Sequence, residues 1–584
     1  MTLVTEQQAP PATASSEEFP GSRPAQGRRI TLGWLRRLRT ESGLVFLIAL
    51  AAYLTAMVLL DLVFNIFPLD AVSRMANGYY VLYSRDPHLA AIGFVWNPLQ
   101  SIAVIPVLLF KDLWPALATH DVAAGLVSAF ASAGAVYQIH AALGELGVRR
   151  TPRLLLVIVF ALNPMIIYYA ANGMSDALYV FTLVATARYL LRWLHHDDLR
   201  SLAYAAVALG FAYLDRNEAV GSALVAGALV FTVSYSRAPG VRRSRVMSAT
   251  TDGAVFLMPV VTAFAGWAIA SDVITGQPFA QFTSQYGTTA QLAASGLHYS
   301  LGARVLHDAN SIEYLAPLLP IVLVLALILA LRRRDVRALG PLAVLGGSLA
   351  FDALGVITNS IEPFYRYYLS AVPLDVLLVG CVVAAAPGSS RLARNSHPDV
   401  GTRSVPLKAI VATVFVIVVG ATSIPASALG IFAKKNVQSA ESQELGALLL
   451  AHPSLSQRQF ANHYAHIESI DAYLDNMHLP SGSIVVDTFG ECTPQIVTTV
   501  TDPKIFVITN DRDFKQVLAD PLTFHAHYLL SPQPTGADVN DALNVAYPTL
   551  YQNGAGFATL FHQFRSDGIC SPYRLYRVTG HPGE

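Results

Sequence analysis

Long apolar stretches recur along most of the chain, separated by short polar connections. A stretch of roughly 20 apolar residues is needed to cross the hydrocarbon core of a bilayer as a helix. By that measure we expect about 11 spans, at residues 44–66, 120–146, 153–171, 175–194, 200–215, 219–236, 252–273, 312–331, 338–358, 365–386 and 407–431. The pattern therefore predicts a polytopic α-helical membrane protein.

Arginine-rich connections decide how the spans are oriented. They lie before the first span and between later ones, at 28–39, 148–153, 192–200, 237–245, 332–334 and 391–403. Cytoplasmic connections carry an excess of Lys and Arg, so this pattern places the N-terminus and these connections in the cytoplasm. The stretch 98–118 is predicted to lie in the membrane interface, because a crossing there would put every later arginine-rich connection outside. The C-terminus then lies outside the cytoplasm.

Composition agrees with a membrane protein. Hydrophobic residues make up 53% of the 584-residue chain and charged residues 13%, whereas a soluble domain carries about 25% charged residues. Lys plus Arg and Asp plus Glu number 39 each, so the net charge indicates no nucleic-acid partner. Residues 1–27 are rich in Pro, Ala, Ser and Glu, and we expect a disordered cytoplasmic tail there, followed by a membrane domain over 28–432.

After residue 432 the pattern changes to that of a soluble domain. Short β-rich runs at 483–487, 504–508, 526–530, 557–564 and 573–578 alternate with helix-like segments. Strands that alternate with helices favour a small three-layer α/β domain over 433–584, on the outer side of the membrane. Cys492 and Cys570 both fall in this domain, where a disulfide can persist. The alternative is two unpaired, buried thiols.

The predicted orientation gathers charged side chains on the outer face. The first outer loop, 67–119, has Asp70 directly after the first span. A carboxylate near apolar walls is expected to have a raised pKa and to accept a proton from an alcohol, the alternative being a solvated loop aspartate. The same face carries the candidate substrate-binding residues Asp86, His88, Asp176, Arg216, Glu218, Glu362 and Arg366.

Some of these residues also have simpler interpretations. Ser175 and Asp176 are of the types that cap a helix N-terminus. Arg216 and Glu218 can pair with each other at the end of a span, where charged groups reach the headgroup level. As functional groups, Arg216 and Arg366 are suited to bind a phosphate through the planar fork of the guanidinium.

Three stretches resemble motifs of the C-type glycosyltransferase superfamily, in its protein mannosyltransferase and aminoarabinose transferase branch. An acidic residue after the first span, followed by a polar and aromatic stretch and by Trp96–Leu99 (WNPL), resembles the family's first outer loop. The segments Asn172–Asp176 (NGMSD) and Glu362–Leu369 (EPFYRYYL) are similar to two further family motifs. Ala71 stands where the family pattern has a second acid after the first. The resemblance covers about residues 44–386.

The resemblance implies transfer of a sugar at the outer face of the plasma membrane, from a polyprenyl-phosphate donor to a hydroxyl of a polysaccharide, lipid or protein acceptor. Asp70 is then expected to act as the general base, with inversion at the anomeric carbon. Arg366 and Arg216 are expected to stabilise the phosphate leaving group, and Asp86 and Asp176 to orient sugar hydroxyls. We expect no cofactor, and a divalent metal remains an open alternative.

Two other classes of function compete with this interpretation. A transporter or flippase of envelope precursors would have inverted repeats and ionisable groups near the middle of the membrane. The sequence has no obvious internal repeat, and its charged groups are predicted at one face. A non-catalytic membrane scaffold for the outer domain would keep its function without Asp70.

Overall fold

The computed structural model describes residues 40–295, 299–384, 407–433, 436, 439–490 and 492–583. The predicted tail at 1–27, the arginine-rich segment before the first span and the basic connection at 391–403 lie outside the described residues.

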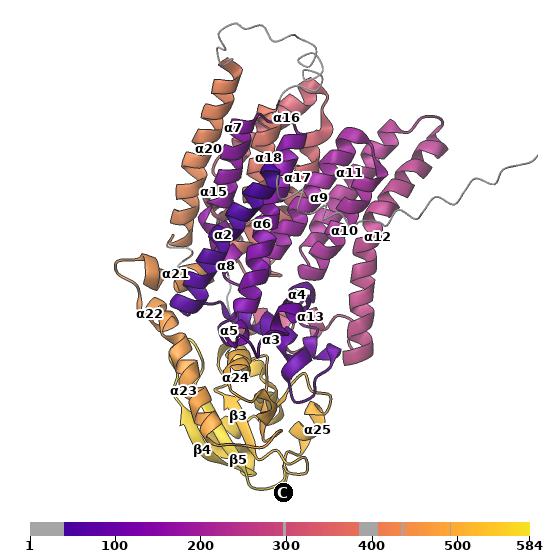
Figure 1. The fold of residues 1–584 in the computed structure, drawn as a ribbon. Helices are drawn as coiled ribbons and strands as arrows, with labels where there is room; N and C mark the ends of the chain where they lie inside the picture. The colour runs from indigo at the N-terminus through magenta and orange to yellow at the C-terminus, as the bar shows by residue number, and fades with distance from the viewer. Residues whose placement is uncertain are drawn as a thin grey trace, which may run out of the picture.

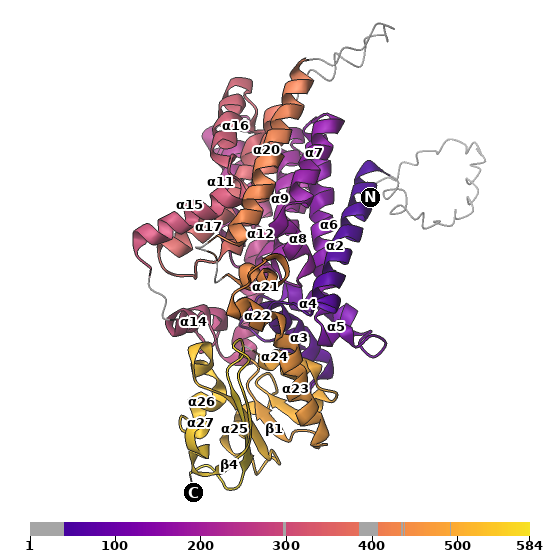
Figure 2. The same cartoon turned by 90° about the vertical axis from the view of Figure 1, so that its left-hand side faces the viewer.

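The described part of the membrane domain is a helix bundle that continues into a small sheet domain at one end (Figures 1 and 2). By length and composition, eight of its helices can cross a membrane. They are α2 with η1 (Glu41–Val63), α6 (Val122–Glu145), α9 (Asp176–His196), α11 (Ala219–Arg237), α12 (Arg242–Thr275), η3 with α17 (Val336–Ile357), η4 with α18 (Tyr365–Val383) and α20 (Leu407–Ile431).

Two further apolar segments are bent pairs of helices, of the kind that forms either a broken span or a re-entrant loop. Helices α7 (Arg150–Ala161) and α8 (Pro164–Ala171) meet at 60°, and α15 (Leu301–Leu315) and α16 (Leu319–Arg333) meet at 77°. The first bend has a local cause, because Asn163 caps α8 and a proline at the start of α8 cannot continue the preceding helix. Counting both pairs gives up to 10 spans in the described residues.

The predicted number of spans is not reached by this measure. The fifth expected span is helix α10 (Leu199–Asp215), which has 17 residues, fewer than the roughly 20 that a straight crossing needs. The stretch 98–118 was predicted not to cross the membrane, and the lengths of its helices agree with that. Its longest helix, α4 (Leu99–Leu108), has 10 residues, about 15 Å of helix, and is too short to cross.

Helix α4 packs against α3 (Leu69–Tyr83), and α5 (Ala116–Thr119) follows it. All three lie at the end of the bundle that carries the sheet domain (Figure 1). The first outer loop therefore folds into short helices between the bundle and the sheet.

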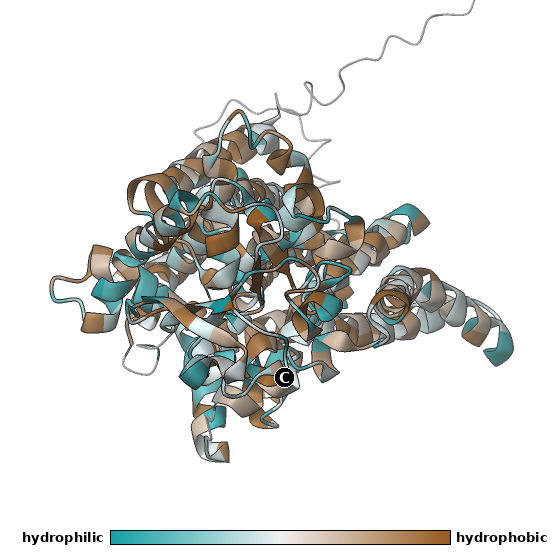
Figure 3. Cartoon of the chain, turned by 90° about the horizontal axis from the view of Figure 1, so that it is seen from below, coloured by the Kyte–Doolittle hydropathy of each residue, from teal (hydrophilic) through white to brown (hydrophobic). Residues whose placement is uncertain are grey.

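The sheet domain has five strands in the order β2-β1-β3-β5-β4. Strands β1 (Ile484–Val486), β2 (Phe506–Ile508) and β3 (Tyr528–Pro532) are parallel, whereas β4 (Ala558–Phe564) and β5 (Tyr573–Val578) run antiparallel at the other edge. Seen from this end of the molecule, hydrophilic and hydrophobic residues are mixed across the segments (Figure 3). The α/β domain predicted from the sequence is confirmed.

Alternate strand residues pack against different helices. Ile484 and Val486 share a core with α23 (His463–Asn476) and α24 (Thr493–Thr499), whereas Val485 packs with α25 (Phe514–Ala519), α26 (Ala542–Ala546) and α27 (Leu550–Asn553). Successive side chains of a strand point to opposite faces, so the sheet lies between two helical layers.

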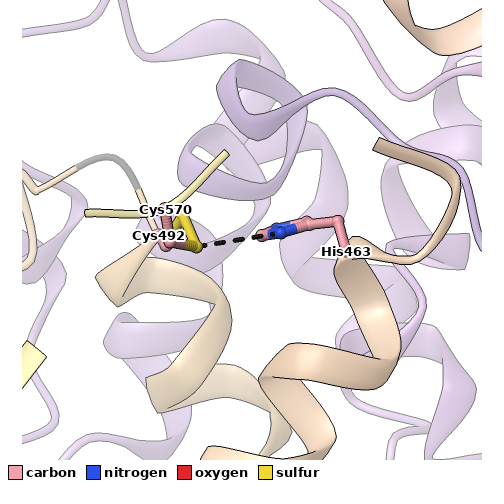
Figure 4. Close-up of side chains that lie close together, drawn as sticks. All are labelled: His463, Cys492 and Cys570. Carbon is pink, nitrogen blue, oxygen red and sulfur yellow. Dashed lines mark hydrogen bonds between the residues drawn. A yellow bond between two sulfur atoms is a disulfide. The ribbon is translucent and has the colours of Figure 1, made fainter. Parts of the chain in front are cut away.

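A disulfide joins Cys492, just before α24, to Cys570, just before β5. The two sulfurs lie beside His463 at the start of α23 (Figure 4). The bond ties one helical layer to the segment that leads into β5, across a separation of 78 residues.

The sheet domain contacts the first outer loop through charged pairs. Arg85 donates to Asp511 (Nε–Oδ2, 3.1 Å) and to Asp513, and Arg512 donates in turn to Asp86. A second contact comes from the connection between α12 and α15, where the Tyr286 hydroxyl donates to Asp487 at 2.7 Å. These contacts hold the sheet domain over the end of the bundle where α3 lies.

Candidate active site

An ion pair between two distant segments lies where the bundle meets the sheet domain. Asp70 is in the first turn of α3, and Arg366 is in the short helix η4 that precedes α18. Arg366 donates from Nη2 to Asp70 Oδ2 at 2.8 Å. The structure thus brings together the two residues that the sequence singled out as the base and the phosphate ligand.

The pKa of Asp70 is shifted in the opposite direction to the expected one. Burial raises the pKa of the Asp70 carboxyl, but the positive charges of Arg366 and Arg74 outweigh burial and hold that pKa below its ordinary value. The predicted rise of the Asp70 pKa was wrong, because the sequence did not show that cations surround the carboxylate. Asp70 is therefore ionised at neutral pH and able to accept a proton.

A second cluster is centred on Arg216, which follows α10. Its Nη1 donates to Asp176 at 2.9 Å, and its Nη2 and Nε donate to Glu218 at 2.7 and 3.1 Å. Both carboxylates thus accept hydrogen bonds from the same guanidinium. This agrees with the simpler interpretation from the sequence, in which Arg216 and Glu218 pair with each other. A ring contact with Tyr367 at 5.3 Å connects Arg216 to the segment that carries Arg366.

A turn containing glycine positions Asp176. Gly173 has φ of +74°, and a Cβ at that position would lie 2.5 Å from Asp121 Oδ2. Only glycine fits both the backbone conformation and the space. The Asn172–Asp176 segment singled out in the sequence is therefore a tight turn that delivers Asp176 to the first turn of α9.

The two clusters border one small pocket. Its lining includes Asp176, Tyr179, Val180, Arg216, Glu218, Asp352, Arg366, Tyr367, Leu369 and Ser370. Three expected spans and the turn at 215–218 thus contribute to a single polar site at the end of the bundle.

Arg74 is a site residue that the sequence analysis missed. It lies one helical turn after Asp70 on α3, is 6% exposed, and stacks on Trp96 at 4.3 Å. Its Nε and Nη1 have no hydrogen-bond partner among the described residues. The spacing of four residues was a usable signal, because such residues lie on the same face of a helix.

Two glutamates of the sheet domain also reach this region. Helix α21 (Ala440–Leu449) buries Glu441 and Glu444 against α8, where Tyr169 donates to Glu441 at 2.5 Å and Tyr168 donates to Glu444. Burial raises the pKa of Glu444 to about 8. No local sequence pattern marks this contact, because it joins residues more than 270 positions apart.

The other candidate residues lie elsewhere. Asp86 pairs with Arg512 of the sheet domain, and the hydrogen bond from Arg512 holds the pKa of that carboxyl well below its ordinary value. His88 Nδ1 is 2.7 Å from the main-chain oxygen of Asp86. Glu362 is in the turn between α17 and η4. Substrate binding by these three residues stays a prediction.

Among the described residues, the one group of three metal-type side chains close enough to share an ion is His463, Cys492 and Cys570 (Figure 4). Its two sulfurs are joined in the disulfide, and His463 Nδ1 is 2.6 Å from Asp567. In the candidate active site, the carboxylates of Asp176 and Glu218 both contact Arg216.

By sequence, the chain matches no protein-family model and no curated protein. By structure, it is similar to ArnT from Cupriavidus metallidurans bound to undecaprenyl phosphate, with a TM-score of 0.52 and 13% identity over 94% of this chain and 98% of that one. The archaeal oligosaccharyltransferase AglB from Archaeoglobus fulgidus, in complex with an inhibitory peptide and a dolichol-phosphate, gives a TM-score of 0.42 and 12% identity over 88% of this chain and 72% of that one.

The likeness to ArnT extends over nearly the whole length of both chains. The chain therefore has the fold of the C-type glycosyltransferases, with a polytopic helical membrane domain and a small C-terminal sheet domain. This confirms the fold class that the sequence motifs predicted. The likeness at this identity concerns the fold, so the function has to be argued from the site.

Proposed function

We propose that the protein is a membrane glycosyltransferase that moves a sugar from a polyprenyl-phosphate donor to an acceptor hydroxyl. The observation that supports this most is the pair of Asp70 and Arg366, with Arg74 beside it, at the end of the membrane bundle. A base next to two cations suits a reaction in which a hydroxyl loses a proton while a phosphate departs. Undecaprenyl phosphate, which is bound in the ArnT structure, is a donor-derived lipid of this type.

Arg74 and Arg366 bind the donor phosphate in this proposal. Within the part of the chain that the structure describes, Nε and Nη1 of Arg74 and Nε of Arg366 have no hydrogen-bond partner. Buried guanidinium N–H groups that lack partners are costly, and a phosphate oxygen satisfies both their hydrogen bonds and their charge. Arg74 thus replaces Arg216 as the second phosphate ligand beside Arg366. Arg216 is less suited to this role because its N–H groups already donate to Asp176 and Glu218.

Asp70 acts as the general base. The acceptor oxygen attacks the anomeric carbon, the bond from that carbon to the phosphate oxygen breaks, and the hydroxyl proton passes to Asp70. Attack opposite to the leaving phosphate inverts the anomeric centre. Arg366 then stabilises both the carboxylate before transfer and the phosphate after it, since its Nη2 contacts Asp70 and its Nε has no hydrogen-bond partner among the described residues.

Asp176 and Glu218 orient the sugar. Both line the pocket beside Arg366, and Arg216 fixes their positions by donating to both. Carboxylate oxygens held in this way can accept hydrogen bonds from sugar hydroxyls. Arg216 is a positioning residue in this scheme.

The proposed location is the plasma membrane, with the sheet domain outside the cytoplasm. Helix α7 begins and α16 ends in arginine-rich segments, and both lie at the end of the bundle opposite the sheet domain (Figure 1). An excess of Arg supports a cytoplasmic position for that end. A polysaccharide, a lipid or a protein can supply the acceptor hydroxyl.

The test is sugar transfer by the purified protein in lipid vesicles. A panel of radiolabelled sugars on polyprenyl phosphate is supplied together with polysaccharide, lipid and protein acceptors, and release of free polyprenyl phosphate and labelling of the acceptor are measured. We expect turnover with at least one donor. Transport of an intact donor across the vesicle membrane without any bond cleavage would favour the flippase alternative instead.

A further inference from the structure

A second cavity lies in the opposite half of the membrane domain. It has a volume of about 730 Å³ and is bordered by α2, α6, α9 and α10, with Phe46, Tyr137, Phe181, Arg188, Arg192 and Tyr204 in its lining. In Figure 1, α6 and α9 lie between α2 and α10, and we call the cavity that these four helices line the groove. Tyr204 belongs to its lining and is 58% exposed, so the groove is open to the outside of the helix bundle.

The groove is separate from the candidate active site. Helix α9 begins at Asp176, which borders that site, and reaches Arg188 about 18 Å further along its axis. A polyprenyl-phosphate donor with its phosphate at Arg74 therefore has its headgroup at the other end of the bundle.

The polar part of the groove carries a net positive charge. Arg188 donates to Glu145 (Nη2–Oε1, 2.6 Å) and to Gln138 (Nη1–Oε1, 2.6 Å). Arg192 is 3.6 Å from the same Glu145 oxygen, and its side chain is 38% exposed. Two guanidinium groups share the Glu145 carboxylate, and Arg192 also interacts electrostatically with Asp198. The lining of the groove itself contains both arginines and no acidic residue.

The rest of the groove is apolar and aromatic. Phe181 packs closely over Gly134, where an added Cβ would lie 2.8 Å from the ring. Phe46 also lines the groove, and the rings of Tyr189 and Tyr204 lie 5.3 Å apart at its mouth. Tyrosines of this kind gather where the acyl region meets the headgroups.

We propose that this groove binds one anionic diacyl phospholipid. The phosphate and headgroup lie against Arg192 and the tyrosine hydroxyls, and one acyl chain follows Phe46 and Phe181. Charge complementarity selects an anionic headgroup, and the lateral opening lets the lipid enter from the bilayer. Basic pockets between membrane helices recognise anionic lipids in this way.

The experiment measures lipid retention by the full-length protein with native mass spectrometry. The protein is purified from nanodiscs that contain equal amounts of phosphatidylglycerol and phosphatidylcholine. We expect one phosphatidylglycerol to be retained in preference. Arg192→Gln should weaken that retention about fivefold, whereas Arg200→Gln, an exposed arginine at the start of α10, should leave it unchanged.

A second variant tests the apolar part of the groove while all its charged residues are kept. Phe46→Trp narrows the space for the acyl chain, so it should also reduce phosphatidylglycerol retention. Equal retention of both lipids, or unchanged retention in both variants, would overturn the proposal. Displacement by undecaprenyl phosphate would assign the groove to the donor lipid, and displacement by glycerol phosphate would assign it to a free phosphate. Either result would overturn the phospholipid assignment.

Discussion

Asp70 and Arg74 lie one turn apart on α3, and this spacing lets a single short helix present a base and a cation to the same site. Arg366 completes the group from a segment nearly 300 positions later. The cations have two effects on Asp70, because they keep the carboxylate ionised and also lower its basicity. In the proposed reaction, the donor phosphate draws Arg74 and Arg366 toward itself and so makes Asp70 a stronger base.

Arg74→Lys tests the phosphate site. Lysine keeps the positive charge but loses the planar stacking on Trp96 and the fork of N–H donors. We expect the affinity for polyprenyl phosphate to fall about 10- to 100-fold, as measured by microscale binding in detergent. Lys111→Arg serves as a control, since Lys111 lies over Tyr83 in the same loop and outside the pocket. Wild-type affinity in the Arg74 variant would remove Arg74 from the site.

For single residues, the sequence predicted which of them belong to the candidate site better than it predicted which of them contact each other. Asp70 and Arg366 were identified because each stands at the end of an apolar stretch. Their mutual contact, and the resulting sign of the Asp70 pKa shift, depend on how two distant segments fold together. Arg74 was missed although its spacing from Asp70 is local.

Among the elements, α21 links the sheet domain to the site. It buries Glu441 and Glu444 against two tyrosines of α8. A buried carboxyl favours its protonated form, so Glu444 carries its proton at neutral pH. The packing of α21 therefore depends on a group that titrates close to physiological pH.

The stability of α21 should fall as the pH rises. The pKa of Glu444 is raised to about 8 in the folded protein, against about 4.3 in an unfolded chain. The stabilisation is then fully present below the unfolded pKa and is lost as the pH rises through the folded pKa. Hydrogen exchange of the α21 amides, corrected for intrinsic rates, should be faster at pH 9 than at pH 6.5.

Glu444→Gln provides the control for this effect. Glutamine has the same shape and no ionisable group, so exchange in α21 should become independent of pH over this range. An unchanged pH dependence in the variant would show that another group is responsible.

Elements with a clear apolar period were predicted well, including the sheet strands and most spans. Helix α10 is the expected span that is missing from the number of counted spans. It is capped by Asp198 and Arg216 and has only 17 residues. The bends in the two helix pairs required knowledge of the tertiary packing, although the proline at the start of α8 was a local signal.

At the scale of the whole molecule, the sheet domain covers the end of the bundle that holds the candidate site. Arg85 and Asp86 of the first outer loop pair with the 511–513 turn, and Tyr286 reaches Asp487 from another outer connection. The sequence predicted both domains but not their contact. Long-range charge pairs of this kind leave no periodic pattern in a single chain.

The disulfide should contribute measurably to the sheet domain. A bond across 78 residues restricts the unfolded chain and is expected to raise the free energy of unfolding by about 4 kcal/mol. Denaturant unfolding of the protein with Cys492→Ser and Cys570→Ser should show this loss in the sheet domain. Cys381→Ser, which removes the free and half-buried cysteine, should leave that transition in place. An unchanged transition in the double variant would contradict a stabilising role.

The central claim is that Asp70 takes the acceptor proton during sugar transfer, and kcat of Asp70→Asn tests it most directly. Asparagine keeps the size of the side chain and removes the base. With a donor that the wild type uses, we predict a fall in kcat of at least about 100-fold, with polyprenyl-phosphate binding retained. Asp112→Asn, an exposed aspartate of the same loop, should keep wild-type turnover. Full turnover by Asp70→Asn would contradict the account.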